Sequence, residues 1–182
     1  PEDGVLVTSG ATEAITDCLM ALINPGDEVV LLEPLYDCYL PLVLRAGGVP
    51  KFVRLDPPHW ELSEERLKAA FSDKTKLLLL NNPMNPTGKV FSLKELELLA
   101  TYVEEYDAFA VCDEVYEHIV FGLNRHIPLA TLPGMGDRTV RIGSAGKTFS
   151  LKGWKVGYMT GAAELIRRIA KAHQFVKFTT PP

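Results

Sequence analysis

Lys147 is the residue of this chain whose neighbours most clearly suggest chemistry. It lies in GSAGKTFSLKGWKVGY, residues 143–158, where Gly-Lys-Thr matches the last three residues of a phosphate-binding P-loop. A P-loop also needs a glycine five positions before the glycine of that triplet, so that the loop can aim backbone N–H groups at phosphate. That position is Arg141, which excludes the P-loop. Lys147 therefore needs another role, and covalent chemistry by its amine is the alternative.

Polar residues directly follow predicted strands at four places along the chain. They are Ser9-Gly10, Asn81-Asn82, Asp113 and Ser144. In open α/β sheets the ligand crevice lies outside the carboxyl ends of the strands. We therefore expect these four strand ends to share one site, and we expect Lys147 to lie in it.

The elements that would position these residues follow from hydrophobic periodicity. Short apolar runs alternate with amphipathic stretches and turn signals, which predicts an α/β fold built in layers. The predicted strands cover residues 5–7, 29–32, 51–55, 77–80, 109–112, 140–142 and 156–160, the last as an edge strand. The predicted helices cover residues 11–22, 41–46, 64–71, 93–105 and 163–173. Ser63 is the predicted N-cap of the third helix, and Ser92 with Glu95 has the spacing of a capping box before the fourth.

Composition restricts the class of protein. The 182 residues have a net charge of −4 and no basic stripe, so nucleic acid is not an expected partner. Three scattered cysteines indicate neither a disulfide framework nor structural zinc, and the four histidines share no metal-ligand spacing, so no metal site is predicted. The chain has no long apolar run and no signal peptide, and we expect a cytoplasmic protein without a membrane partner.

Four segments carry a resemblance to a known family. NNPMNPTG (81–88), DEVY (113–116), SAGKT (144–148) and GWKVGY (153–158) occur in this order along the chain. Together they resemble the large domain of fold-type I pyridoxal-phosphate (PLP) enzymes, in particular class I/II aminotransferases of the kynurenine aminotransferase group. The resemblance covers essentially the whole chain. It implies a three-layer α/β/α domain with a mostly parallel central sheet over residues 1–182.

The resemblance implies three catalytic residues. Lys147 is similar to the lysine that forms a Schiff base with PLP and carries the Cα proton. Asp113 resembles the aspartate that keeps the pyridine nitrogen protonated, so that the ring accepts electrons. Tyr116 and Asn85 match residues near the phenolate oxygen of the cofactor. Without the other motifs, Asn85 would be explained equally well as a turn residue, Asp113 could be a strand-end carboxylate that caps a turn, and Tyr116 could be a core residue.

The remaining cofactor contacts are also implied by the resemblance. The backbone at Gly10, Ala11 and Thr12 opens a helix whose N–H groups and dipole suit the cofactor phosphate. The Ser144 hydroxyl and the Lys155 charge would add to this grip, and Tyr36 matches the aromatic residue that stacks on the cofactor ring. Taken alone, the first group is a helix start and Tyr36 a half-buried tyrosine. The resemblance also predicts a cis peptide bond at Asn85-Pro86.

The implied activity is transfer of an amino group between an amino acid and a 2-oxo acid, by a homodimer. Two alternatives remain open: β-elimination of cysteine conjugates, which uses the same lysine, and a sensor domain that binds PLP without turnover. The chain begins at Pro1 rather than Met, and its ends suggest truncation on both sides. We therefore expect the small domain, with its substrate-carboxylate arginine, to be absent, and the chain alone to be incomplete for turnover.

Overall fold

The computed structural model describes residues 2–177, so residue 1 and residues 178–182, at the two ends of the predicted domain, lie outside the described residues. The strands are β1 (Val5–Thr8), β2 (Glu28–Glu33), β3 (Val49–Arg54), β4 (Thr75–Asn81), β5 (Phe109–Asp113), β6 (Thr139–Ser144) and β7 (Gly157–Thr160). The α-helices are α1 (Ala11–Leu22), α2 (Tyr39–Arg45), α3 (Glu64–Ala70), α4 (Leu93–Glu105), α5 (Ala145–Thr148) and α6 (Ala163–Val176). Short 3₁₀ turns are η1 (Glu2–Gly4), η2 (Leu129–Thr131) and η3 (Lys152–Trp154).

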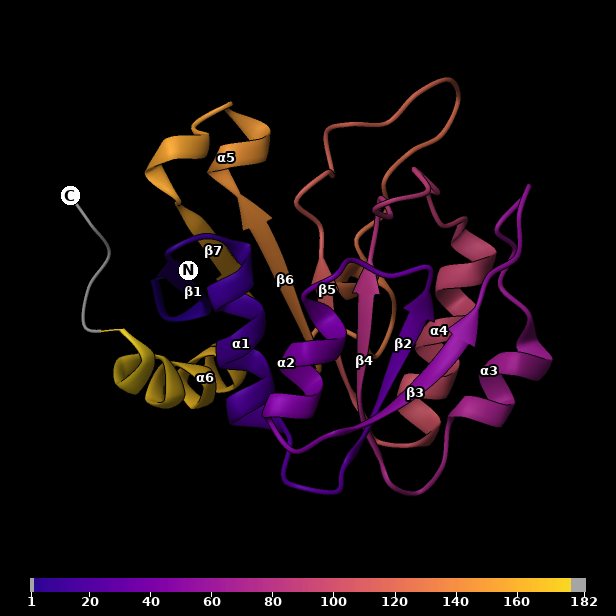
Figure 1. Cartoon of the computed structure of the whole chain (residues 1–182), viewed down its shortest axis with the longest axis horizontal. Coiled ribbons are helices and arrows are strands. Elements are labelled where there is room, and N and C mark those ends of the chain that lie inside the picture. The colour runs from indigo at the N-terminus through magenta and orange to yellow at the C-terminus, as the bar shows by residue number, and fades with distance from the viewer. Residues whose placement is uncertain (1, 178–182) are drawn as a thin grey trace.

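All the strands belong to one sheet in the order β1-β7-β6-β5-β4-β2-β3. β3, β2, β4, β5 and β6 pair in parallel, and β7 runs antiparallel to both of its neighbours. Helices cover both faces of the sheet, as Figure 1 shows. The predicted three-layer fold with a mostly parallel sheet is confirmed.

The two faces of the sheet carry separate hydrophobic cores. In β4, Leu77 and Leu79 pack with helices α1, α2 and α6, whereas Leu78 and Leu80 pack with α3 and α4. All four side chains are buried. Successive strand residues point to opposite faces, so a strand covered on both faces must be apolar at every position. This explains the unbroken apolar run in β4.

The prediction that residues 156–160 form an edge strand is wrong. β7 lies between β1 and β6, and it pairs with β1 from Val5↔Thr160 to Thr8↔Gly157. The edges of the sheet are β1 and β3. A strand of only four residues gives no local signal of a second partner, and that partner comes from the other end of the chain.

The predicted helix signals are confirmed. The Ser63 side chain caps α3, and Ser92 and Glu95 form both hydrogen bonds of a capping box on α4. Asn85-Pro86 is cis as predicted, and Glu33-Pro34 is cis as well. Within residues 2–177, none of the helices combines the length and apolar character that crossing a bilayer requires.

Candidate active site

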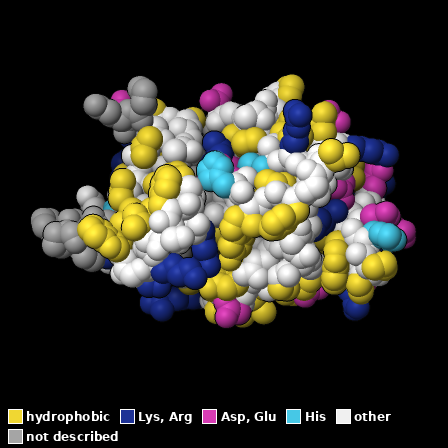
Figure 2. All heavy atoms as spheres, turned by 90° about the horizontal axis from the view of Figure 1, so that it is seen from above, with side chains coloured by type: hydrophobic (Ala, Val, Ile, Leu, Met, Phe, Trp, Pro, Cys, Tyr) yellow, Lys and Arg dark blue, Asp and Glu magenta, His cyan; other side chains and the backbone are white. Residues whose placement is uncertain are grey.

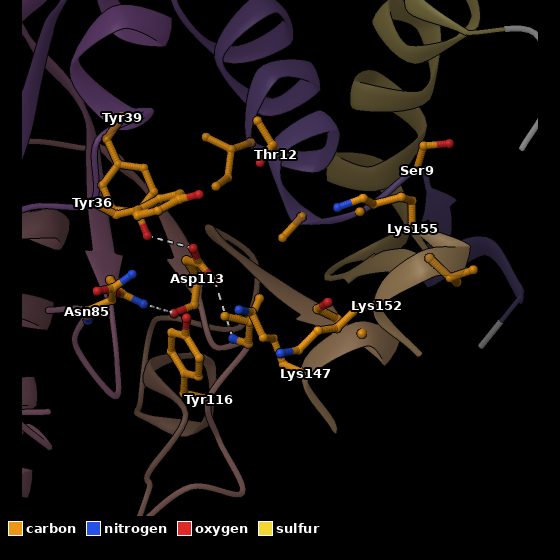
Figure 3. A pocket seen from close by; sticks show the side chains of 18 residues that line it. Ser9, Thr12, Tyr36, Tyr39, Asn85, Asp113, Tyr116, Lys147, Lys152 and Lys155 are labelled. Carbon is orange, nitrogen blue, oxygen red and sulfur yellow. Dashed lines mark hydrogen bonds between the residues drawn. The ribbon is translucent and has the colours of Figure 1, made fainter. Parts of the chain in front are cut away.

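A cavity of about 360 Å³ opens at the carboxyl ends of β1, β4, β5 and β6. The four polar strand ends therefore meet, as the sequence predicted. Every residue predicted for the site lines this cavity, and Figure 3 shows several of their side chains converging on it. These residues are Gly10, Ala11, Thr12, Tyr36, Asn85, Asp113, Tyr116, Ser144, Lys147 and Lys155.

Asp113 ends β5 and is the buried acid of the cavity, with 5% of its surface exposed. The Tyr39 hydroxyl donates a hydrogen bond of 2.6 Å to its Oδ2, and the Val115 N–H donates one of 3.3 Å to its Oδ1. Burial raises the pKa of Asp113, and the Tyr39 hydrogen bond opposes that shift. The charged form of a carboxylate buried in this way would be stabilised most by a cationic group of a ligand beside it.

Two asparagines hold the turn after β4 against the end of β5. The Asn81 side-chain amide donates to the Asp113 carbonyl at 2.9 Å, and its Oδ1 accepts the Asn85 N–H at 2.6 Å. The backbone of Asn85 is thereby fixed. Its side chain stands at the rim of the cavity (Figure 3).

Lys147 lies three residues beyond Ser144, the last residue of β6, on the single turn of α5. Its Nζ lies 5.3 Å from the centre of the Tyr116 ring, on the ring face. The short helix places the amine at the carboxyl end of the sheet, near Asp113 (Figure 3). This arrangement puts a nucleophilic group and a buried acid in the same cavity.

The cavity lining is positively charged. Lys147, Lys152 and Lys155 line it, against the one carboxylate of Asp113 among the described lining residues. Three amines around one acid suit a ligand that is itself anionic.

The start of α1 forms one end of the cavity and is suited to an anion. Gly10 is the N-cap at φ 88°, and no side chain among the described residues caps this helix. The N–H groups of Ala11 and Thr12 are therefore left for a ligand. Gly157 lets the start of α1 pack closely against β7, because a β-carbon at position 157 would lie 2.5 Å from the Gly10 backbone. Lys155, at a left-handed φ of 53°, points its amine toward this helix start (Figure 3).

An aromatic pair borders the cavity on the side of α2. Tyr36 is 39% exposed, and its ring meets Tyr39 edge to face, with centroids 5.6 Å apart and planes at 75°. Tyr39 is buried and contacts both Tyr36 and Asp113. It thus fixes the orientation of the other two side chains.

The donor set fits PLP, which the resemblance implies. A phosphate suits the uncapped start of α1, a pyridine nitrogen suits Asp113, and a carbonyl carbon suits the Lys147 amine. The open face of Tyr36 suits a flat ring.

Several polar lining residues were not assigned to the cofactor by sequence reasoning, among them Asn81, Lys152 and Tyr39. Asn81 was predicted only as a polar residue at a strand end. Tyr39 had no signal at all, because its bond to Asp113 joins residues separated by 74 positions.

Comparisons with known proteins agree with this site. The family model described as "Aminotransferase class I and II" matches residues 1–181. Kynurenine–oxoglutarate transaminase of Dictyostelium discoideum is 45% identical, over 97% of this chain and 45% of its own length.

Solved structures give the same result. N-Succinyldiaminopimelate aminotransferase of Mycobacterium tuberculosis superposes with a TM-score of 0.95 at 44% identity, over 98% of this chain and 47% of that one. YbdL of Escherichia coli, described with a methionine aminotransferase function, gives 0.94 at 36% identity, over 98% and 47%. The chain thus spans about half the length of the relatives it matches.

Proposed function

Because this chain belongs to the class I and II aminotransferases, we propose that its protein transfers an amino group between an amino acid and a 2-oxo acid. The observation that carries the proposal is the placing of Lys147 and the buried Asp113 in one cavity. The family is PLP-dependent, and PLP supplies, when bound, an aldehyde that reacts with amines and a ring that withdraws electrons.

Four side chains of this protein carry the chemistry in this proposal. The Asp113 carboxylate holds a proton on the pyridine nitrogen, where low exposure strengthens the pairing. The Lys147 amine would take the proton from the substrate Cα and carry it to the cofactor, so that the amino acid can leave as its 2-oxo acid. The Tyr116 hydroxyl and the Asn85 amide donate to the phenolate oxygen.

Binding is assigned to the opposite end of the cavity. The N–H groups of Ala11 and Thr12, the Ser144 hydroxyl and the Lys155 amine hold the phosphate. Tyr36 covers one face of the ring. This division keeps the binding contacts separate from Lys147, so cofactor affinity and reaction rate are expected to respond to different substitutions.

The amino-acid substrate has to be found by experiment. The similar proteins are named for kynurenine with oxoglutarate, for N-succinyldiaminopimelate and for methionine, at identities between 36% and 45%. Those three amino acids are the first test panel, with 2-oxoglutarate as acceptor. Product release that needs no 2-oxo acid, with ammonia and pyruvate from a cysteine conjugate, would favour the β-lyase instead.

The deciding experiment compares Lys147→Ala with Lys152→Ala in the whole protein loaded with PLP. Sodium borohydride should attach the cofactor irreversibly to the parent protein and to the Lys152 variant, but not to the Lys147 variant. Both lysines line the cavity, so Lys152→Ala controls for lost positive charge. Equal attachment in the Lys147 variant would refute the assignment.

Self-association is a further part of the proposal. Hydrophobic side chains are exposed on the face at the carboxyl ends of the strands (Figure 2). Phe121, Leu123, Phe149 and Trp154 are exposed by 78%, 102%, 67% and 66% in the loops beyond β5 and α5. Such side chains favour a homodimer. A monomeric sedimentation profile at high protein concentration, with PLP present, would contradict self-association.

A cytoplasmic location remains a prediction, supported by three free thiols.

A further inference from the structure

Three ligand-type side chains meet between α1, which lines the cavity, and α6. Glu13 and Asp17 are one turn apart on α1, and His173 faces them from α6. His173 Nδ1 lies 2.8 Å from Asp17 Oδ2 and 3.6 Å from Glu13 Oε1. One ligand atom from each residue lies within 4.8 Å of the others.

Two oxygens of this cluster have no partner within the described part of the chain. The Asp17 side chain is 0% exposed, and its Oδ1 makes no hydrogen bond to residues 2–177. Glu13 Oε1 is likewise buried without a hydrogen-bond partner there. Buried carboxylate oxygens nearly always have a donor or a cation, so these two indicate a missing ligand of positive charge.

We propose that Glu13, Asp17 and His173 bind a divalent cation of the zinc class. One imidazole nitrogen with two carboxylates is a ligand set that Zn²⁺ accepts, whereas Mg²⁺ prefers oxygen ligands alone. Ligand atoms about 2.1 Å from a tetrahedral Zn²⁺ are about 3.4 Å apart. His173 Nδ1 already lies 2.8 Å from Asp17 Oδ2 and 3.6 Å from Glu13 Oε1, on either side of that separation. Small side-chain movements are therefore enough.

A second cluster of two glutamates and a histidine differs from the first, because an arginine side chain already pairs with its carboxylates. Glu114, Glu117 and His126 also lie close together, but the Arg141 guanidinium fills that cluster. Its Nε lies 2.6 Å from Glu114 Oε2, and its Nη2 lies 3.0 Å from Glu117 Oε2. The two carboxylates of that cluster are thus already paired with a cation.

The nearest ammonium to the first cluster does not replace a metal. Lys177 Nζ donates to the Ser9 hydroxyl and stays 4.0 Å from Glu13 Oε2. The Lys177 ammonium does not form a hydrogen bond with either of the two unpartnered oxygens, Glu13 Oε1 and Asp17 Oδ1. A bound cation would therefore compete with Lys177 for the negative charge of Glu13.

The proposed cation would connect α6 to the loop that begins the cavity. Glu13 Oε2 accepts the Ser9 N–H at 2.6 Å, and Ser9 lines the cavity beside Gly10. Holding Glu13 and His173 together would thus steady the start of α1. Histidine spacing predicted no metal site, because Asp17 and His173 are separated by 156 positions.

The test is calorimetric titration of Zn²⁺ into the whole protein after treatment with EDTA. One site per chain is expected, with tighter binding of Zn²⁺ than Mn²⁺ and none of Mg²⁺. His173→Gln and Glu13→Gln should each weaken Zn²⁺ binding at least ten-fold. His59→Gln, at an exposed histidine, is the matched control and should change nothing. Zn²⁺ at 100 times its Kd for the parent should raise the melting temperature by roughly 5–10 °C in the parent and in the His59 variant, and by much less in the two ligand variants.

A variant that is expected to bind Zn²⁺ more tightly than the parent provides a second test. Lys177→Gln removes the competing charge and should tighten Zn²⁺ binding several-fold, whereas a simple ion-pair cluster predicts no change. Circular dichroism checks that each variant is folded, and Glu13→Gln keeps an acceptor for Ser9 if His173→Gln fails. No Zn²⁺ binding, or equal binding by the parent and both ligand variants, would overturn the proposal.

Discussion

Replacing Asp113 by Asn should separate stability from chemistry, because the two effects have opposite signs. Burial raises the pKa of Asp113, so in the cofactor-free protein its charged form is less favourable than in the unfolded chain. The stability that Asp113 contributes is therefore present at low pH and lost as the pH rises through its folded pKa. An Asn side chain does not ionise, so the variant avoids this loss of folding stability at high pH, and its side-chain oxygen still accepts a hydrogen bond from the Tyr39 hydroxyl. Without cofactor, Asp113→Asn should melt no lower than the parent at pH 8.

The kinetic effect should be large and unfavourable. In the proposed function, the Asp113 carboxylate, which is 5% exposed, would balance positive charge on the ring nitrogen of bound PLP. Losing one such charge-assisted contact where the transition state needs it costs about 2.7–4 kcal/mol, or roughly 10²–10³ in rate. Binding of PLP should weaken far less, since the phosphate contacts at Ala11 and Thr12 remain.

The assay is a single-turnover half-reaction with the amino acid, followed by absorbance, beside thermal melting from pH 4 to 8. The difference in melting temperature between Asp113→Asn and the parent should shrink as the pH falls toward 3.8, the usual pKa of Asp. A variant that melts lower than the parent but reacts at a near-normal rate would refute the reasoning. Asp113 would then be a strand-end residue that fixes the following turn.

Two further substitutions test the surroundings of the site, and a third tests the capping box of α4. Tyr39→Phe removes a hydrogen bond to a charged group, worth about 1.5–3 kcal/mol, and should slow the half-reaction at least ten-fold while moving the Asp113 limb of its pH profile upward. Gly157→Ala places a β-carbon 2.5 Å from the Gly10 backbone, so PLP affinity should fall and stability drop by roughly 1–3 kcal/mol; unchanged affinity by fluorescence titration would contradict this. Glu95→Gln should cost about 1 kcal/mol at pH 7 by urea unfolding. Burial would raise the pKa of Glu95, but its hydrogen bonds lower it, so its contribution is present above pH 4.5 and lost at lower pH, where parent and variant should converge.

Local sequence was enough to predict most of the elements and the polar strand ends that meet at the site, whereas the other site residues were implied by the family resemblance. Ser92 and Glu95 capped a helix where their spacing predicted it, because a capping box depends only on residues one turn apart. The apolar run of β4 could also be predicted locally, because a strand buried on both faces is apolar at successive positions. Asp113 and Ser144 could be placed at one site, since the carboxyl ends of parallel strands share one edge of a sheet.

Tertiary structure decided what depends on distant partners. β7 became an interior strand because β1, about 150 residues earlier, pairs with its free edge. The hydrogen bond of Tyr39 to Asp113, and the meeting of His173 with Asp17, span 74 and 156 positions. Periodicity reports which face of an element is apolar, but the direction of a single polar side chain depends on the neighbour that packing places beside it. That is why the sequence could predict the cavity and most of its lining, while the residue that orients Asp113 and the cluster between α1 and α6 became visible only in the folded chain.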